Sequence, residues 1–159
     1  MSFSIRKATS EDMDGVLDLI KELAVFEKEP HAVKIDSEIL RKYGLGTHPL
    51  FTCFVAAIKE NIVGIALVYN RFSTWAGKSL HLEDLIVSQK YRGQGIGQSL
   101  YDRVMTHAHE NDAKRVEWVV LDWNKNAIDF YKKSGAQFLK DWYLVQMDEK
   151  QLSSYVKRL

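Results

Sequence analysis

The stretch YRGQGIGQSL, residues 91–100, places three glycines and an arginine between an apolar run and a segment with helical periodicity. The run before it, Leu80–Val87, is typical of a strand, and Ile96–Asn111 repeats apolar residues at the spacing of one helical face. The first N–H groups of a helix have no intrahelical acceptor, and glycines let a bulky anion approach them. The stretch therefore indicates a phosphate-binding loop or, alternatively, a plain glycine-rich turn.

Two named phosphate motifs do not match this stretch. The dinucleotide fingerprint G-x-G-x-x-G requires a glycine where Gln98 stands, and the P-loop requires G-K-[ST] where Gly97 is followed by Gln98-Ser99. The pattern that is present is R-x-x-G-x-G, running from Arg92 to Gly97. The loop therefore predicts a phosphate ligand of another kind.

Composition and length favour one ordinary globular domain over residues 1–159. The hydrophobic share of 46% and the charged share of 27% are those of a soluble protein, and the net charge of +1 gives no field that would recruit nucleic acid or an anionic membrane. No apolar run approaches the ~18–20 residues of a membrane span, and the N-terminus has no signal-peptide core. With Cys53 as the single cysteine, no internal disulfide can form, and we expect a cytoplasmic protein.

The segments on either side alternate between strand-like and helix-like patterns, which predicts an α/β layer protein with a mixed sheet. Thr9 with Asp12 resembles a capping box, and Asn124 is a second candidate helix cap. Strands are expected at 3–8, 50–58, 62–69, 80–87, 116–121 and 137–147, and helices at 9–24, 36–43, 96–111, 124–134 and the C-terminus.

Five blocks of sequence carry a resemblance to a known family: IKELAVFEK (20–28), HPLF (48–51), STWAGKSLHLEDLIV (73–87), YRGQGIG (91–97) and LDWNKNAIDFYKKSGAQ (121–137). In this order they resemble the diamine acetyltransferase branch of the GNAT superfamily, which contains the spermidine/spermine and thialysine N-acetyltransferases. FEK, STW, RGQGIG and VLDWN look more like the thialysine type. The resemblance covers about residues 3–147.

This resemblance implies a fold and a reaction. The fold would be a single GNAT domain, with a mixed, mostly antiparallel, twisted sheet, helices on both faces and a V-shaped splay between the two central strands. Acetyl-CoA would bind in that splay as co-substrate, and the enzyme would acetylate a primary amine of a small cationic substrate as a homodimer without a metal. Trp75 is a candidate for the dimer interface.

The resemblance also implies the site residues. The backbone of Leu85, Ile86 and Val87 would bind the pantetheine arm of coenzyme A. The pyrophosphate would lie on Arg92, Gly93, Gln94, Gly95, Ile96, Gly97 and Gln98, and the far side of the cofactor on Asn124, Ala127 and Tyr131. The active-site positions are Glu83 and Tyr131, and the substrate side holds Phe26, Glu27, Glu83, Asp84, Asp122 and Asp141.

The chemistry of amine acetylation suits these residue types. An amine is mostly protonated at neutral pH and must lose a proton before it attacks a thioester, so Glu83, acting through water, is the predicted base. Tyr131 is the predicted acid, because a phenol can donate a proton to the leaving thiolate. Neighbours on a strand face opposite sides, so Glu83 or Asp84 should point inward. A structural ion pair and a core tyrosine are the alternatives.

The acidic residues of the substrate side, Glu27, Asp84, Asp122 and Asp141, would supply local negative charge to a nearly neutral chain. Cys53 lies in the run LFTCFVAAI without an adjacent base, which favours a packed core thiol and direct attack in a ternary complex. His107 and His109 diverge by about 200° on a helix and predict no metal site.

The sequence also departs from the family pattern. His81 stands where relatives carry tyrosine, Phe26 replaces a tyrosine, and residues 137–142 are shortened before Trp142. These positions lie on the amine side, so the identity of the amine stays open. Two other functions remain: a non-catalytic module that binds coenzyme A, or an acetyltransferase of the same fold acting on a protein or an antibiotic.

Overall fold

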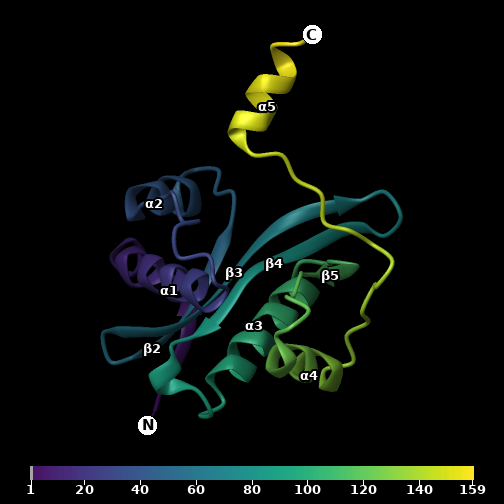
Figure 1. The fold of residues 1–159 in the computed structure, drawn as a ribbon. Helices are drawn as coiled ribbons and strands as arrows, with labels where there is room; N and C mark the ends of the chain where they lie inside the picture. The colour runs from purple at the N-terminus through teal and green to yellow at the C-terminus, as the bar shows by residue number, and fades with distance from the viewer. Residues whose placement is uncertain (1) are drawn as a thin grey trace. The chain divides into compact units, whose positions relative to one another are not determined.

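The computed structural model describes residues 2–159 (Figure 1). The chain divides into two compact units, with the boundary between Leu121 and Asp122. The first unit is built on a sheet of order β1-β2-β3-β4-β5, and all neighbours are antiparallel except β4 and β5. Its strands are β1 (Ser4–Lys7), β2 (Thr52–Ile58), β3 (Asn61–Ser73), β4 (Gly77–Val87) and β5 (Arg115–Glu117). The predicted mixed, mostly antiparallel sheet is confirmed.

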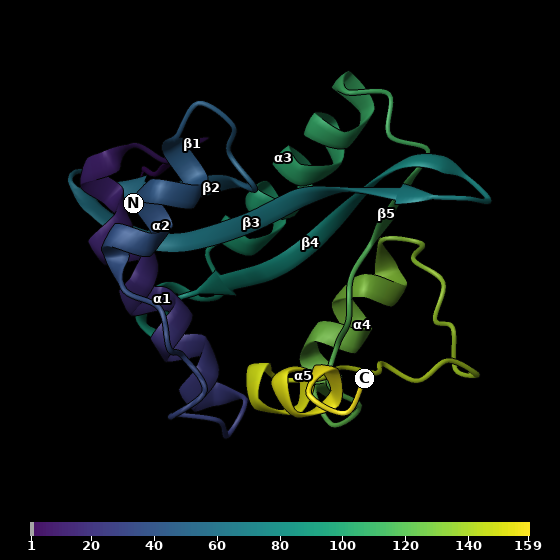
Figure 2. The same cartoon turned by 90° about the horizontal axis from the view of Figure 1, so that it is seen from above.

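The helices of the first unit are η1 (Ser10–Asp12), α1 (Met13–Phe26), α2 (Ser37–Leu45), η2 (Gln89–Tyr91) and α3 (Ile96–Glu110). They cover both faces of the sheet, and Figure 2 shows α1 and α3 on opposite sides of it. Alternation along β2 divides the core: Cys53 and Val55 pack with α1 and α2, whereas Phe54 packs with α3. The predicted helices on both faces are confirmed.

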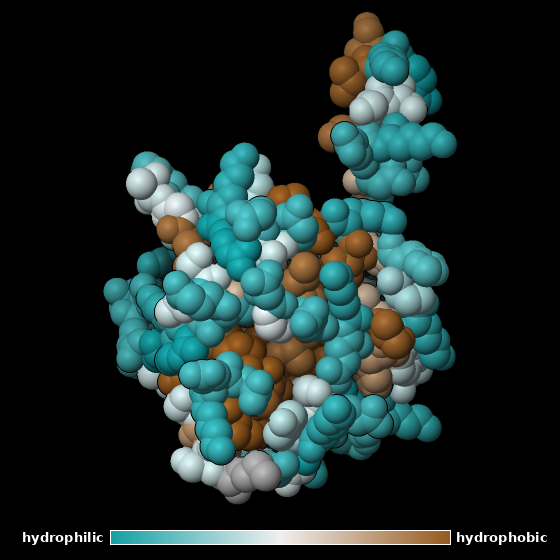
Figure 3. Space-filling view, turned by 90° about the vertical axis from the view of Figure 1, so that its left-hand side faces the viewer, coloured by the Kyte–Doolittle hydropathy of each residue, from teal (hydrophilic) through white to brown (hydrophobic). Residues whose placement is uncertain are grey.

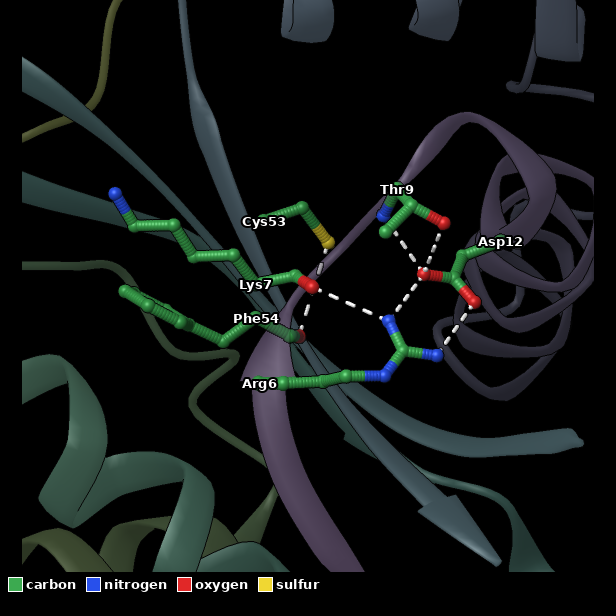
Figure 4. A network of polar contacts seen from close by, with 6 residues as sticks. All are labelled: Arg6, Lys7, Thr9, Asp12, Cys53 and Phe54. Atoms are coloured by element: carbon green, nitrogen blue, oxygen red, sulfur yellow. Dashed lines mark hydrogen bonds and ion pairs between the residues drawn. The ribbon is translucent and has the colours of Figure 1, made fainter. Parts of the chain in front are cut away.

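The start of α1 is tied to β1 by a polar network (Figure 4). Asp12 accepts hydrogen bonds from Arg6 Nη2 at 2.9 Å and from the backbone N–H of Thr9 at 2.7 Å, and the Arg6 guanidinium also donates to the carbonyl of Lys7. The hydrogen bonds from Arg6 hold the pKa of Asp12 below its usual value. The predicted pairing of Thr9 with Asp12 is confirmed, and it fixes the angle at which the chain enters α1.

The two parallel strands separate soon after they meet. β5 pairs with β4 only from Ser79 to His81, opposite Arg115–Glu117, while β4 runs on to Val87 with β3 as its only strand neighbour. The open edge of β4 therefore begins just before Glu83. The two strands therefore diverge as the predicted V-shaped splay requires, but β5 is the edge strand of this sheet and not, as predicted, a central one.

The second unit holds α4 (Lys125–Lys133) and α5 (Glu149–Val156). Its predicted strand at 137–147 is wrong, because the chain there has no regular secondary structure. The predicted strand 116–121 is also too long, since pairing ends at Glu117. Both segments have the apolar composition of strands, but a strand forms only where a partner strand accepts its backbone hydrogen bonds.

The surface on the side of α1 and α2 is largely hydrophilic, with scattered hydrophobic patches (Figure 3). This mixture agrees with the net charge of +1. Among residues 2–159, none of the helices combines the length and the apolar character needed to cross a bilayer.

Candidate active site

The glycine-rich loop joins the end of β4 to the start of α3. Gly93 has φ 76° and Gly95 has φ 80°, a left-handed conformation that side chains other than glycine rarely adopt. Gly95 is the N-cap residue of α3, and no side chain caps the helix there. A Cβ built on Gly93 or Gly95 would meet no atom within 4 Å. The loop thus presents the first N–H groups of α3 to open space, as a bound pyrophosphate requires.

Arg92 links this loop to two other elements. Its Nε donates a hydrogen bond to the carbonyl oxygen of Val87 at 3.0 Å, and its guanidinium lies 5.4 Å from the centre of the Phe26 ring. Arg92, which is predicted to bind the pyrophosphate, therefore lies beside two other predicted site residues. These are Val87, at the end of the segment predicted to bind pantetheine, and Phe26, on the predicted substrate side. Arg92 adds a full positive charge beside the partial charge of the helix end.

A β-bulge decides how the two acidic residues of β4 lie. Leu67 pairs with Asp84 and Val68 pairs with Leu82, which leaves Glu83 without a partner on β3. Asp84 therefore shares the α1 face of the sheet with Leu67, and Glu83 Oε2 lies 3.5 Å from Nε2 of His81 on the same face. The expectation that the two side chains face opposite sides is wrong, because the extra residue breaks the alternation.

These carboxylates form a cluster with the end of α1. Burial, followed by the charges of Glu83 and Glu27, raises the pKa of Asp84 to about 6. Partial desolvation also raises the pKa of Glu27, the residue that caps α1. Of the predicted substrate-side residues, Glu27, Glu83 and Asp84 thus share one electrostatic environment, and Phe26 precedes Glu27. A buried carboxyl group with two further carboxylates near it is suited to a cationic ligand.

The open edge of β4 carries the predicted pantetheine residues. Leu85, Ile86 and Val87 pair with Ala66, Ile65 and Gly64 of β3, so their other edge faces the splay. The side chains of Leu85 and Val87 pack on the α3 side, while that of Ile86 is buried on the α1 side. The Ser88 N–H donates to the Val63 carbonyl of β3, so by antiparallel alternation the backbone of Ile86 also faces β3, and that of Leu85 and Val87 faces the open edge. Because Arg92 already occupies the Val87 carbonyl, the backbone of Leu85 is left to bind an extended ligand.

The second unit holds the remaining predicted site residues, and the predicted cap is present. Asn124 Oδ1 accepts a hydrogen bond from the Ala127 N–H at 3.2 Å and so caps α4. Tyr131 is buried, and its ring stands edge-on to Phe130 at 5.4 Å. Asp122 and Asp141 are exposed. That these residues act together with those of the first unit stays a prediction.

The structure agrees with the interpretation of Cys53 as a core residue. The thiol is buried, and burial raises its pKa to about 12, so it is protonated and unsuited to attack a thioester. Within residues 2–159, no group of three or more His, Cys, Asp or Glu side chains is arranged to hold a metal ion.

Sequence reasoning missed His81 as a member of the site. It noted His81 only as a departure from the family, whereas the structure places it, buried, beside Glu83. The signal was available, because residues two apart on a strand face the same side.

Comparison with known proteins gives consistent findings. Residues 14–136 match the model of the acetyltransferase (GNAT) family. The chain is similar to the thialysine N-epsilon-acetyltransferase of Mus musculus, with 41% identity over 148 residues that cover 88% of this chain and 87% of the relative. It is also 33% identical to the spermidine/spermine N(1)-acetyltransferase-like protein 1 of Homo sapiens, over 94% of this chain and 23% of that protein.

Among solved structures, an integron cassette protein from the mobile metagenome of V. cholerae has a TM-score of 0.80 at 22% identity, covering 99% of both chains. At this identity the likeness supports the fold alone.

Proposed function

The chain belongs to the GNAT family of acetyltransferases, and on that premise we propose that it transfers the acetyl group of acetyl-CoA to a primary amine of a small cationic substrate. The observation that carries this proposal is the arrangement around β4. A glycine loop with open space beside Gly93 and Gly95 follows the end of β4, and three carboxylates lie around the β-bulge of the same strand. An anion site and a cation site on one strand are what an acidic co-substrate and a basic acceptor need.

We propose that coenzyme A lies along the splay with its pyrophosphate on Arg92–Gln98. Its pantetheine arm would accept and donate hydrogen bonds along the open edge of Leu85–Val87, and Asn124 and Ala127 would contact its far side. Acetyl-CoA supplies the activated thioester. The positive φ of Gly93 and Gly95, and the open space at both, support this fit.

The proposed reaction is a direct attack in a ternary complex. The protonated amine loses a proton to Glu83 through water, and its nitrogen bonds to the acetyl carbon. The carbon–sulfur bond breaks as the Tyr131 hydroxyl gives a proton to the sulfur, and the second proton of the nitrogen then leaves the new amide and restores the hydroxyl. A backbone N–H near Leu85 would stabilise the oxyanion. The buried, protonated thiol of Cys53 supports this route over an acyl-cysteine intermediate.

For the acceptor, we propose a thialysine-like amino acid in preference to a polyamine, with Phe26, Glu27, Glu83 and Asp84, and also Asp122 and Asp141, on the substrate side. The name of the murine relative supports this choice. A single domain over residues 1–159, a homodimer and a cytoplasmic location are further parts of the proposal. Trp75, 86% exposed at the β3–β4 turn, is the proposed interface residue.

An acceptor screen tests the proposal. Acetyl-CoA is supplied with thialysine, lysine, spermidine, putrescine or glycine, and the released thiol is measured. We expect turnover, with the highest kcat/KM for thialysine. A higher kcat/KM for spermidine would contradict the choice of acceptor, whereas coenzyme A binding without turnover of any amine would indicate a non-catalytic module.

A further inference from the structure

His81 stands at the centre of a polar chain that crosses three strands of the sheet. On one side its Nδ1 lies 3.5 Å from Nη1 of Arg71 on β3, and on the other its Nε2 lies 3.5 Å from Oε2 of Glu83. The ring is 9% exposed and rests against the ring of Tyr69, with 4.9 Å between centres and 31° between planes. Both nitrogens of this imidazole are therefore committed to charged neighbours.

Arg71 is itself held from the next strand. It forms an ion pair with Glu117 of β5, whose other oxygen lies 2.9 Å from Nε of Arg115. This fixes the guanidinium against the Nδ1 side of His81. The result is a chain of contacts from Glu117 through Arg71 and His81 to Glu83, built on the α1 face where β4 and β5 still pair.

We propose that His81 is a positioning residue that holds the Glu83 carboxylate in the orientation in which it receives the proton of the amine. The proposal rests on the proposed function of Glu83.

The tautomer of His81 follows from its neighbours. A guanidinium can only donate hydrogen bonds, so Nδ1 facing Arg71 must accept, and a neutral imidazole then carries its proton on Nε2, toward Glu83. Burial lowers the pKa of His81, against the opposing effects of Glu83 and Glu117 and in the same direction as that of Arg71. The ring is therefore neutral at neutral pH and offers Glu83 a fixed N–H donor.

Glu83 needs such a donor because of the bulge. The residue has no partner on β3, and its side chain is 51% exposed, so backbone pairing does not fix its carboxylate. Two side chains of the α1 face stand beside it: the Tyr69 hydroxyl, which hydrogen-bonds it, and Nε2 of His81 at 3.5 Å. A misplacement of about 1 Å in a reacting group can cost about 100-fold in rate. Because His81 is itself held by Arg71, its N–H restricts the positions that the carboxylate can take beside Tyr69.

Two substitutions at His81 separate positioning from packing. His81→Phe keeps an aromatic ring against Tyr69 but removes both nitrogens, whereas His81→Gln restores an N–H donor near the place of Nε2. We expect His81→Phe to lower kcat about tenfold, to leave the KM for acetyl-CoA unchanged, and to move the low-pH limb of kcat/KM upward by about one pH unit, because a carboxylate that loses a donor is protonated more readily.

His81→Gln should recover most of the loss. The matched control is His107→Phe, since His107 lies on α3 against Phe54, on the other face of the sheet, and should keep both kcat and the pH profile. A folded His81→Phe enzyme with wild-type kcat and an unchanged pH profile would overturn the proposal. A loss that His81→Gln does not recover would also overturn it.

A second measurement does not depend on turnover. Nitrogen-15 spectra of the resting protein should show His81 as the Nε2–H tautomer, and Glu83→Gln should lower the pKa of His81 further, because the Glu83 charge raises it. An Nδ1–H tautomer, or a His81 pKa that ignores Glu83→Gln, would contradict the contact. If the wild-type protein acetylates no amine, the proposed function fails while these spectra still test the contact.

Discussion

The loop Arg92–Gln98 and the carboxylate cluster of Glu27, Glu83 and Asp84 serve the same predicted cleft but are built by different forces. The loop takes its shape from the backbone itself, with glycines at positive φ before α3, and it costs the folded chain little. The cluster brings carboxylates from α1 and β4 around a buried carboxyl group, and burial, followed by the charges of Glu83 and Glu27, raises the pKa of Asp84 to about 6. The anion side is preformed, whereas the cation side holds a carboxylate that is costly to ionise until a cationic substrate stabilises its charge.

The largest effect should come from filling the loop. Gly95→Val would place a branched side chain where we expect the pyrophosphate, at a φ of 80° that valine does not tolerate. We expect coenzyme A affinity to fall at least about 100-fold, or ~3 kcal/mol. Isothermal titration calorimetry on the folded variant measures it.

The control for backbone strain is Gly77→Val. Gly77 has φ 91° and the same open space around its Cβ, but it lies at the β3–β4 turn. Both variants should melt earlier than the wild type, and only Gly95→Val should lose coenzyme A. Near-native affinity in folded Gly95→Val would remove the loop from the proposed site.

The second-largest effect should come from Tyr131→Phe, a residue outside both the glycine loop and the carboxylate cluster. It removes one oxygen and keeps the buried ring beside Phe130. If Tyr131 protonates the leaving sulfur, kcat should fall about 30- to 100-fold, near the lower end of general-acid effects because a thiolate is a fair leaving group. Coenzyme A affinity should hold within severalfold, and the high-pH limb of kcat should move.

Tyr101→Phe is the matched control, because Tyr101 is another buried tyrosine, on α3, edge-on to Trp118 at 5.8 Å. Removal of the Tyr101 hydroxyl should leave kcat unchanged. Wild-type kcat and an unchanged pH profile in Tyr131→Phe would exclude it as the acid.

The difference between the two regions also explains what the sequence could predict. The loop was predictable, since positive φ at Gly93 and Gly95 is a local property of glycine before a helix. The helix caps Thr9 and Asn124 were predictable because a side-chain cap is also a local feature of the chain.

The register between two strands is not a local property of the chain, and the sequence did not predict it. The bulge at Glu83 depends on how β3 meets β4, and nothing in the run Leu80–Val87 reveals it. The same limit applies to residues 137–147, which have the apolar composition of a strand but no strand partner in the structure. For His81, the contact with Arg71 of β3 depends on this register, whereas its place two residues before Glu83 on one strand could be seen in the sequence.

A third prediction measures the cost of the carboxylate cluster. The pKa of Asp84 is about 6 in the folded protein against an ordinary value of 3.8, so between these pH values the folded state binds more protons than the unfolded state. Stability should therefore fall as pH rises from about 4 through about 6, by about 1–2 kcal/mol after allowing for relaxation around the cluster. Asp84→Asn should remove this part of the pH dependence.

The measurement is the change in Tm between pH 4.5 and pH 7.5, compared between wild type and Asp84→Asn. Comparing changes rather than absolute Tm values cancels any packing cost of the amide. Asp18→Asn, an exposed carboxylate of α1, is the control and should keep the wild-type difference. An equal difference in Asp84→Asn would contradict the raised pKa of Asp84 in the folded protein.

The smallest effect should come from Glu27→Gln, at the exposed rim of the cluster. Glu27 contributes to the raised pKa of Asp84, and its own pKa is raised by partial desolvation, so it lies near enough to share a cation but remains in contact with solvent. We expect KM for the amine to rise about fivefold, or ~1 kcal/mol, with kcat within about twofold, because an interaction made equally with the bound amine and the transition state changes only KM.

Salt dependence sharpens this last test. The Glu27→Gln effect should shrink at high ionic strength, since exposed charges are screened, and charge reversal in Glu27→Lys should enlarge it. Glu29→Gln removes an equal charge two residues further on and should leave KM unchanged if the cluster, rather than the general field of the chain, attracts the amine. A fall in kcat at constant KM would instead place Glu27 in the chemical step. The carboxylates of the cation side would then take part in the reaction and not only in binding the amine.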